Sequence, residues 1–427
     1  MKTRFYLMIL LVAFSNISTW AATSIEEVSR HFAKNEIDYD SLSNYIYDNN
    51  HAGEVYWWAL HNSQAGDAMA NYILGRCYLS GIGTSQNEQK AIPIFEKAIS
   101  DGIDEGLVDL GKIYLNGWGV DKDYAKAIKY LKQSSDKGNP RGKVCLGITY
   151  FDKQEYDKAI SLYKAASEAG YSGGYLGMGY MHEMGYGVER DLTKALDYYL
   201  KASQKGDDTA MCNIGLMYEN GIGVDMDHKM ASKYYQASAA KGNERGEYKV
   251  GNMYRWGDFT EEVSYEKAAT WYRKSADKNY TPAKVELAFM MFDGLGMPEN
   301  KPQAVAMLES VDKKYIASLS ASRIAEYYFT SNPIKALEWA KYAYNTADEY
   351  FSTVESAKLL GLIYLKGGKE VYDYNLAVKY LREGAELDQP ECVSLMKALG
   401  ESFEEPIEGI SPGISPSVEI YGGSFQE

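Results

Sequence analysis

The side chains best suited to catalysis or metal binding are scarce in this sequence. Only five histidines occur, and none lies in a metal-ligand spacing such as His-Glu-x-x-His. His182 and Glu183 are adjacent, but neighbouring residues on a helix point in different directions and cannot work as an acid–base pair. We therefore predict no catalytic residue, no metal site and no enzymatic activity.

Glycine-rich segments such as Gly81-Ile82-Gly83-Thr84 are the next candidates, because helix N-termini that follow such loops can bind phosphate. No strand pattern precedes these segments, and no Lys-Ser or Lys-Thr follows them, as a phosphate loop requires. We interpret them as turns between helices and expect no cofactor.

The four cysteines are far apart in the sequence, so none forms a local pair. Export would permit disulfides, but the wide spacing favours small buried apolar side chains instead. The four are Cys77, Cys145, Cys212 and Cys392.

The composition fits an acidic protein with a packed core. Hydrophobic residues make up 45% of the chain, and tyrosine occurs 38 times, which suits interfaces where one end of a ring is buried and the other is wet. The formal net charge is -14 and the pI about 5.0. Such a charge repels nucleic acid and anionic lipid, so neither is an expected partner.

The N-terminus has the pattern of a signal peptide over Met1–Ala21. Lys2 and Arg4 form a basic region, Phe5–Phe14 form an apolar region too short to span a bilayer, and small residues suit cleavage after Ala21. An uncleaved anchor is the alternative. No later run has the length and apolarity of a transmembrane helix, so we expect a secreted or periplasmic mature chain.

From residue 67 to 400 one pattern recurs at intervals of 32 to 37 residues. Each copy begins with a small residue, and four positions later comes an apolar residue that is followed directly by Gly. Tyr or a large apolar residue lies three positions after this Gly, and Gly-x-Gly follows. Apolar positions at this spacing share one helical face, and Gly-x-Gly breaks the helix. The central positions are Gly75, Gly111, Gly147, Gly179, Gly215, Gly251, Ala288, Ala325 and Gly361.

A second half-repeat follows each of these, with Ala and an aromatic or Leu three residues later, as at Ala127 and Tyr130. The Ala is often preceded by Lys. Eleven residues after several of these alanines comes a glycine, such as Gly138, that we expect to end the second helix in a left-handed conformation. One pair cannot bury its apolar face alone, so neighbouring pairs must stack.

Three regions depart from the pattern. The Gly-x-Gly loop is missing after Gly147 and after Ala325. Residues 22–66 look like degenerate capping helices, as expected for a terminal repeat, and residues 401–427 look like an acidic flexible tail with six Glu and no Lys or Arg.

The segments LGKIYLNGWGV and IGLMYENGIGV closely match the pattern of Sel1-like repeats, and the chain resembles that family over about nine copies. The resemblance implies an all-α fold, a right-handed α/α solenoid of tetratricopeptide-like pairs whose first helices line a concave groove. Twelve residues are then predicted to point into the groove and bind a protein or peptide: Tyr72, Arg76, Lys112, Asn116, Tyr180, Glu183, Glu219, Asn220, Tyr248, Asn252, Arg255 and Trp256.

The resemblance further implies an exported, bacterial binding scaffold acting in envelope processes or host interaction. Two alternatives stay open. A cysteine-rich Sel1-like group is said to bind or hydrolyse β-lactams, but its repeats each carry a Cys pair that is absent here. A luminal adaptor of the endoplasmic reticulum is the other, although Ser424–Glu427 is not a retention signal.

Overall fold

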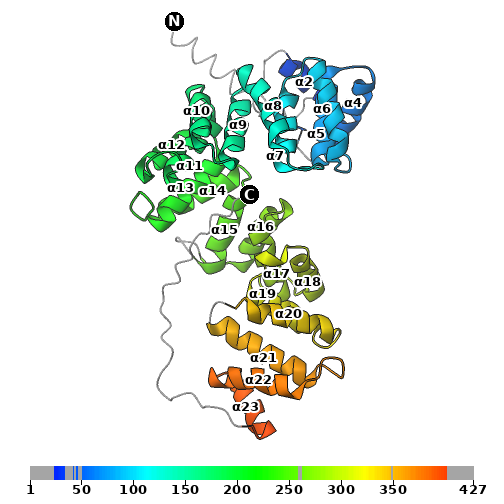
Figure 1. Ribbon diagram of the computed structural model, residues 1–427, viewed down its shortest axis with the longest axis vertical. Helices are drawn as coiled ribbons and strands as arrows, with labels where there is room; N and C mark the ends of the chain where they lie inside the picture. The colour runs from blue at the N-terminus through cyan, green and yellow to red at the C-terminus, as the bar shows by residue number, and fades with distance from the viewer. Residues whose placement is uncertain are drawn as a thin grey trace. The chain divides into compact units, whose positions relative to one another are not determined.

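The computed structural model describes residues 24–33, 42, 45–46, 51–257, 262–347 and 350–401. These residues form α-helices joined by short turns, with one short 3-10 helix and no β-strand among them (Figure 1). The predicted all-α class is therefore confirmed. The chain divides into two compact units, Met1–Asp227 (unit 1) and His228–Glu427 (unit 2). The predicted signal peptide and residues 402–427 of the predicted tail lie outside the described residues.

Unit 1 consists of consecutive packed pairs, each with a first helix, called helix A, and a second, called helix B. The A helices are α5 (Ala68–Ser80), α7 (Glu105–Asn116), α9 (Pro140–Asp152), α11 (Ser172–Met184) and α13 (Asp208–Asn220). The B helices are α6 (Glu88–Ser100), α8 (Tyr124–Asp136), α10 (Tyr156–Glu168) and α12 (Leu192–Gln204).

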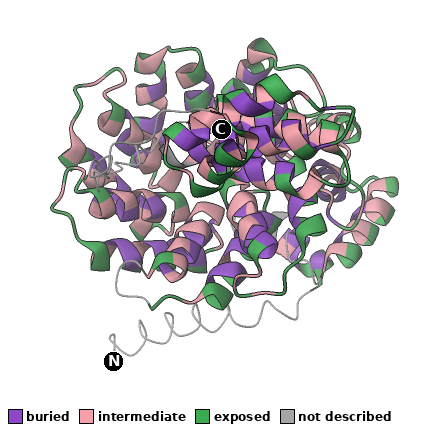
Figure 2. Ribbon diagram, turned by 90° about the horizontal axis from the view of Figure 1, so that it is seen from below, coloured by how far each residue is buried: buried purple, intermediate pink, exposed green. Residues whose placement is uncertain are grey.

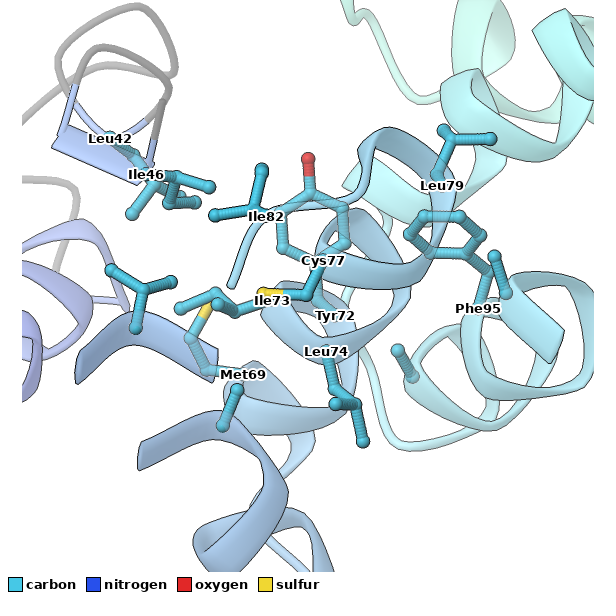
Figure 3. Close-up of a cluster of buried hydrophobic side chains, with 14 of the residues drawn as sticks. Leu42, Ile46, Met69, Tyr72, Ile73, Leu74, Cys77, Leu79, Ile82 and Phe95 are labelled. Carbon is cyan, nitrogen blue, oxygen red and sulfur yellow. The ribbon is translucent and has the colours of Figure 1, made fainter. Parts of the chain in front are cut away.

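The N-terminal end of unit 1 closes the stack with α2 (Ile25–Ala33) and α4 (Ala52–Gln64). Leu42 and Ile46 are fully buried in the same core cluster as α4 and α5 (Figure 3). Trp58 packs against this cluster, whereas Trp57 is 67% exposed.

Unit 2 continues the same arrangement of pairs. Its A helices are α15 (Glu244–Trp256), α17 (Thr281–Asp293), α19 (Ser318–Tyr328) and α21 (Tyr350–Lys366), with α23 (Pro390–Leu399) last. Its B helices are α14 (His228–Ala240), α16 (Tyr265–Asp277), α18 (Lys301–Glu309), α20 (Pro333–Asn345) and α22 (Tyr374–Glu386), and a 3-10 helix, η3 (Lys313–Tyr315), precedes α19.

Most of these helices have the same length because the same residue types begin and end them. Asp or Asn side chains accept a backbone N–H at the start, as Asp67 does for α5 and Asn87 does for α6. Glycines in the left-handed region end most of the A helices, as Gly81 does with φ of 72°. Gly138, predicted to follow the end of a B helix, also has a positive φ.

In the repeats that have a central glycine, this residue lets helix B cross helix A closely. A Cβ on Gly179 would lie 2.6 Å from the ring of Tyr199, and the same distance separates a Cβ on Gly251 from Tyr272. Phe95 covers Gly75 in the same way, and its ring lies beside that of Tyr72 in Figure 3. These B-helix residues come four positions after the repeated Ala, not three.

The residue three positions after that Ala forms the outer part of the same contact. It stacks on the aromatic residue that follows the central glycine by three, as Tyr130 does on Tyr114 with ring centroids 5.9 Å apart. His182 stacks on Tyr198 at 5.6 Å and 11°. His182 therefore packs in the contact between the two helices of its repeat.

The Lys that precedes the repeated Ala also has a partner in the structure. Its ammonium group lies over the ring three residues after the central position, a favourable cation–π geometry. The pairs are Lys90 over Tyr78 at 5.5 Å, Lys126 over Tyr114 at 4.8 Å, Lys158 over Tyr150 at 4.9 Å, Lys267 over Tyr254 at 4.8 Å and Lys335 over Tyr328 at 4.2 Å.

The second glycine of each Gly-x-Gly loop joins one repeat to the previous one. Gly187 has a φ of 68°, and a Cβ there would lie 2.8 Å from the Cβ of Tyr156 at the start of α10. Gly119 meets the start of α6 in the same way. The loop is therefore a turn, as predicted, and it also packs against the previous repeat.

The two repeats predicted to lack this loop do lack it. Helix α9 ends at Asp152 and α10 begins at Tyr156, while α19 ends at Tyr328 and α20 begins at Pro333. Figure 2 shows buried and exposed residues distributed around the helices. B helices such as α8 have several exposed residues along their length, whereas the A helices α5 and α7 expose only their last residues, Ser80 and Asn116. Within each unit, the part of the A helices that carries the predicted binding residues is called the A-helix face.

Candidate interaction surface on the A-helix face

The first two predicted groove residues are buried. Tyr72 is fully buried and Arg76 is 5% exposed, and the Arg76 Nη1 donates a 3.0 Å hydrogen bond to the Tyr72 hydroxyl. Arg76 also forms an ion pair with Asp109 of α7, with N and O atoms 3.8 Å apart. Burial lowers the pKa of the Arg76 guanidinium, and Asp109 opposes that effect. These residues link two A helices and do not themselves form open surface.

The next predicted pair lies on α7 and reaches the surface. Asn116 is exposed, and Lys112 is half-buried with its Nζ 5.8 Å from the ring centroid of Trp118. Trp118 is 38% exposed at the tip of a Gly-x-Gly loop. A cation, an amide and an aromatic ring thus lie next to one another at the end of this helix.

Tyr180 on α11 belongs to a cluster of half-buried rings. Its centroid lies 5.6 Å from Phe151 and 6.1 Å from Tyr186, and Tyr156 stacks on Tyr186 at 5.1 Å. Burial raises the pKa of the Tyr180 hydroxyl, and Tyr186 adds to the effect. Tyr180, predicted as a binding residue, thus contacts Tyr186, which follows α11 in the Gly-x-Gly loop.

Glu183, also on α11, is held by a residue that the sequence pattern did not mark. The hydroxyl of the buried Tyr199 donates a 2.5 Å hydrogen bond to the Glu183 carboxylate. Glu219 is half-buried on α13, and Asn220 is exposed with its amide donating to the Leu216 carbonyl at 3.0 Å.

The four predicted residues of α15 form a stripe in unit 2. The Tyr248 ring lies 5.8 Å from Tyr272, whose hydroxyl donates a 2.8 Å hydrogen bond to Asn252. The Arg255 guanidinium lies 4.7 Å above the ring of Trp256. Of the four side chains, only that of Trp256 is mostly exposed, at 61%.

Arg255 is fixed from the neighbouring A helix. It forms an ion pair with Glu286 of α17, and its side chain is 11% exposed. One repeat further, Arg323 of α19 pairs with Asp293 of α17 at 3.4 Å. Glu286 belongs to the repeat after that of Arg255, and Asp293 to the repeat before that of Arg323, so no local pattern in the sequence connects these partners.

The described residues contain no group of three or more His, Cys, Asp or Glu side chains placed to hold a metal ion. None of the four cysteines forms a disulfide, and burial raises the pKa of the Cys77 and Cys392 thiols to about 12. Thiols with such pKa values are protonated at neutral pH and are poor nucleophiles. Within the part of the chain that the structure describes, no helix has the length and apolarity needed to cross a membrane.

A known structure shares this fold. The protective antigen c5321 of uropathogenic Escherichia coli strains, which displays an SLR fold, superposes with a TM-score of 0.52 at 24% identity, covering 82% of this chain and 76% of its own. A Sel1 repeat protein from Oxalobacter formigenes is 23% identical with a TM-score of 0.46, covering 57% of this chain and 98% of its own. Among curated proteins no sequence matches the chain.

The sequence itself matches the model of the Sel1 repeat over most of its length. The matched segments are residues 68–103, 104–139, 147–171, 173–207, 208–243, 245–280, 281–310, 322–345 and 354–389. They include both repeats without a Gly-x-Gly loop. With the helix pairs described above, they show that the chain belongs to the Sel1 repeat family.

Proposed function

We propose that this protein is an exported scaffold that binds a peptide or a partner protein along its A-helix face, in the concave groove expected for such a solenoid. Proteins of the Sel1 repeat family typically serve as scaffolds for protein–protein interaction. The observation that carries the proposal for this chain is Trp256, a large aromatic ring that stands exposed on a rigid support.

The support of Trp256 is what distinguishes it from a surface ring without a fixed orientation. Arg255 covers one face of the ring, and the ion pair of Arg255 with Glu286 holds the guanidinium in place. Binding therefore costs little side-chain entropy. Covering the exposed part of the ring stabilises a complex by about 2 kcal/mol, and Trp and Arg are enriched among residues that dominate binding.

The other predicted residues contribute to the A-helix face of their own unit in different ways. Asn116 and Asn220 are exposed amides that can bond to a peptide backbone, and Lys112, Tyr180 and Glu183 are partly accessible. Tyr72 and Arg76 hold α5 and α7 together beneath this face. In unit 2, Tyr272 contacts both Tyr248 and Asn252, and the parts of these two side chains that stay accessible can contact a partner.

Replacing Trp256 by Ala tests the proposal. The exposed ring contributes little to the core, so helicity and thermal unfolding stay as in the wild type, while capture of the partner from an envelope extract falls by about tenfold. Captured proteins are quantified by mass spectrometry against the wild-type chain.

Trp57→Ala is the matched control, because that ring is 67% exposed on α4 and does not belong to the predicted surface. We expect Trp57→Ala to capture the same proteins as the wild type. If the two tryptophan variants lose the same partners to the same degree, or neither loses any, binding does not use the α15 stripe and this proposal is wrong.

A further inference from the structure

An open hollow lies between the B helices α8 and α10 of unit 1, beside the A helix α9 that packs against both (Figure 1). Its volume is about 390 Å³, within the range of about 300–1,000 Å³ that is usual for ligand sites. The buried Leu146 and the half-buried Tyr150 and Leu162 form an apolar floor, and exposed residues of α8 and α10 form the rim. None of the residues that line the hollow is among the twelve predicted binding residues.

The repeat pattern accounts for this hollow. In several other repeats, the residue three positions after the repeated Ala stacks on the ring three positions after the central glycine. Such pairs are Tyr114 with Tyr130, His182 with Tyr198 and Tyr364 with Tyr380, whose ring planes differ by 9°, 11° and 3°. In the repeat of α9 and α10 the same two positions hold Tyr150 and Leu162, and both line the hollow.

Tyr150 makes one of the two contacts that its counterpart Tyr114 makes. A lysine ammonium group lies over each ring, at 4.8 Å from the centroid of Tyr114 and 4.9 Å from that of Tyr150. Tyr114 is also stacked with Tyr130, whereas among the residues that the structure describes no aromatic ring contacts Tyr150. Because leucine has no ring, Leu162 cannot supply the stacking contact, and the hollow lies beside both side chains.

One other repeat places an aliphatic residue opposite a tyrosine, and there a ring comes from another helix. Ile94 of α6 occupies the position of Leu162, and Tyr78 occupies that of Tyr150. The ring of Tyr56 on α4 contacts Tyr78 edge-on, with centroids 6.1 Å apart. The first repeat thus obtains its ring contact from a neighbouring helix, and no described helix does the same for Tyr150.

The charges at the rim favour an uncharged occupant. Lys132 pairs with Asp136 at 2.8 Å and Lys158 with Glu155 at 2.5 Å, so the lysines offer no surplus charge to an anion. Lys158 also lies over the Tyr150 ring and repels a second cation, such as a guanidinium group, from the same ring.

We propose that this hollow binds an aromatic side chain of a partner protein, above all tryptophan, which stacks on Tyr150 as Tyr130 stacks on Tyr114. The faces of the indole ring contact Tyr150 and Leu162. Its N–H can donate to the exposed carboxylate of Asp157 at the rim. Because the hollow is open to solvent, the ring can enter while the peptide backbone that carries it stays outside. This site is separate from the A-helix face and so goes beyond the proposed function.

The test uses the full chain and two capped tripeptides, acetyl-Gly-Trp-Gly-amide (the tryptophan peptide) and acetyl-Gly-Leu-Gly-amide (the leucine peptide). Binding is followed by saturation-transfer difference NMR. Since a single side chain makes the contact, we expect saturable binding of the tryptophan peptide with a roughly millimolar Kd. The leucine peptide, which cannot stack, should bind about tenfold more weakly.

Leu162→Tyr fills the hollow with the ring that other repeats carry at this position. We expect this variant to bind the tryptophan peptide about tenfold more weakly than the wild type, with a midpoint of thermal unfolding that is unchanged or raised. Ile148→Tyr is the matched control, because it adds the same ring to α9 at a residue that is 40% exposed and does not line the hollow. It should bind the tryptophan peptide as the wild type does.

Tyr150→Leu keeps the test decisive even if Leu162→Tyr does not fold. It removes the stacking surface without adding volume, so the two peptides should then bind equally weakly. The inference is overturned if the wild type does not bind the tryptophan peptide or binds both peptides equally, or if Leu162→Tyr binds as the wild type does. Binding of 3-methylindole without binding of the tryptophan peptide also overturns it, since the site would then take free aromatic molecules. The Trp256 experiment uses other residues in unit 2, so the proposed function and this inference can fail separately.

Discussion

At the scale of single residues, burial separates two kinds of predicted binding residue. Tyr72 and Arg76 have the residue types of a binding surface, yet they are enclosed and paired with Asp109. Their positions in the repeat could be predicted from the sequence. Their burial could not, because the carboxylate that pairs with Arg76 comes from the following repeat and no local pattern connects the two.

The buried pair predicts a large effect of removing one partner. Asp109→Ala leaves Arg76 with its Tyr72 hydrogen bond but without a carboxylate, and a buried charge without compensation costs about 3 kcal/mol. We expect the urea midpoint for loss of helical circular dichroism in unit 1 to fall accordingly.

The double variant Arg76→Met with Asp109→Leu is the control for this prediction. Uncharged side chains of similar volume need no compensating charge, so the double variant should recover most of the stability lost in Asp109→Ala. A single variant that unfolds at the wild-type midpoint would show that the ion pair contributes nothing at this position.

At the scale of helices and loops, the sequence predicted most of what the structure shows. The central glycines, the loop positions and the two repeats without loops all follow from the repeat pattern. The pattern does not identify the B-helix residue that packs on the central glycine, because residues three and four positions after the Ala lie on the same face of the helix. Only packing shows that Tyr199 and Tyr272 are the buried ones.

The second loop glycine gives a prediction at this scale. Gly187→Ala places a methyl group 2.8 Å from the Cβ of Tyr156, at a φ of 68° that L residues rarely adopt. Strain and collision together should destabilise unit 1 by about 3 kcal/mol. The midpoint of thermal unfolding measures the loss.

Gly138→Ala separates the two causes. Gly138 has a φ of 87°, but nothing lies within 4 Å of a Cβ built there, so only the backbone strain of about 1 kcal/mol applies. If both variants lose the same stability, the loop glycine is kept for its backbone conformation alone and not for the contact between repeats.

At the scale of the whole molecule, the number of repeats was accessible from the sequence but the division into units was not. The family matches run from residue 68 to 389, as the repeat spacing predicts. The boundary between the units falls at Asp227, inside a matched repeat. No change in composition marks that position, because cohesion within a unit depends on long-range contacts rather than on residue type.

Export is the property of the whole chain that the repeats cannot supply, and it depends on Met1–Ala21. When the full chain is expressed in a bacterium, we expect the soluble product to be recovered from the periplasm or medium with Ala22 as its first residue.

Loss of Lys2 and Arg4 takes the net charge from -14 to -16, so the mature chain focuses at a more acidic pH than the precursor. Deleting residues 2–21 should leave the protein folded in the cytoplasm, because the first described core residue, Ile25, lies after this segment. Recovery of the intact N-terminus from the cytoplasm of cells expressing the full chain would refute export, and recovery of the intact N-terminus in the membrane fraction would instead support an uncleaved anchor.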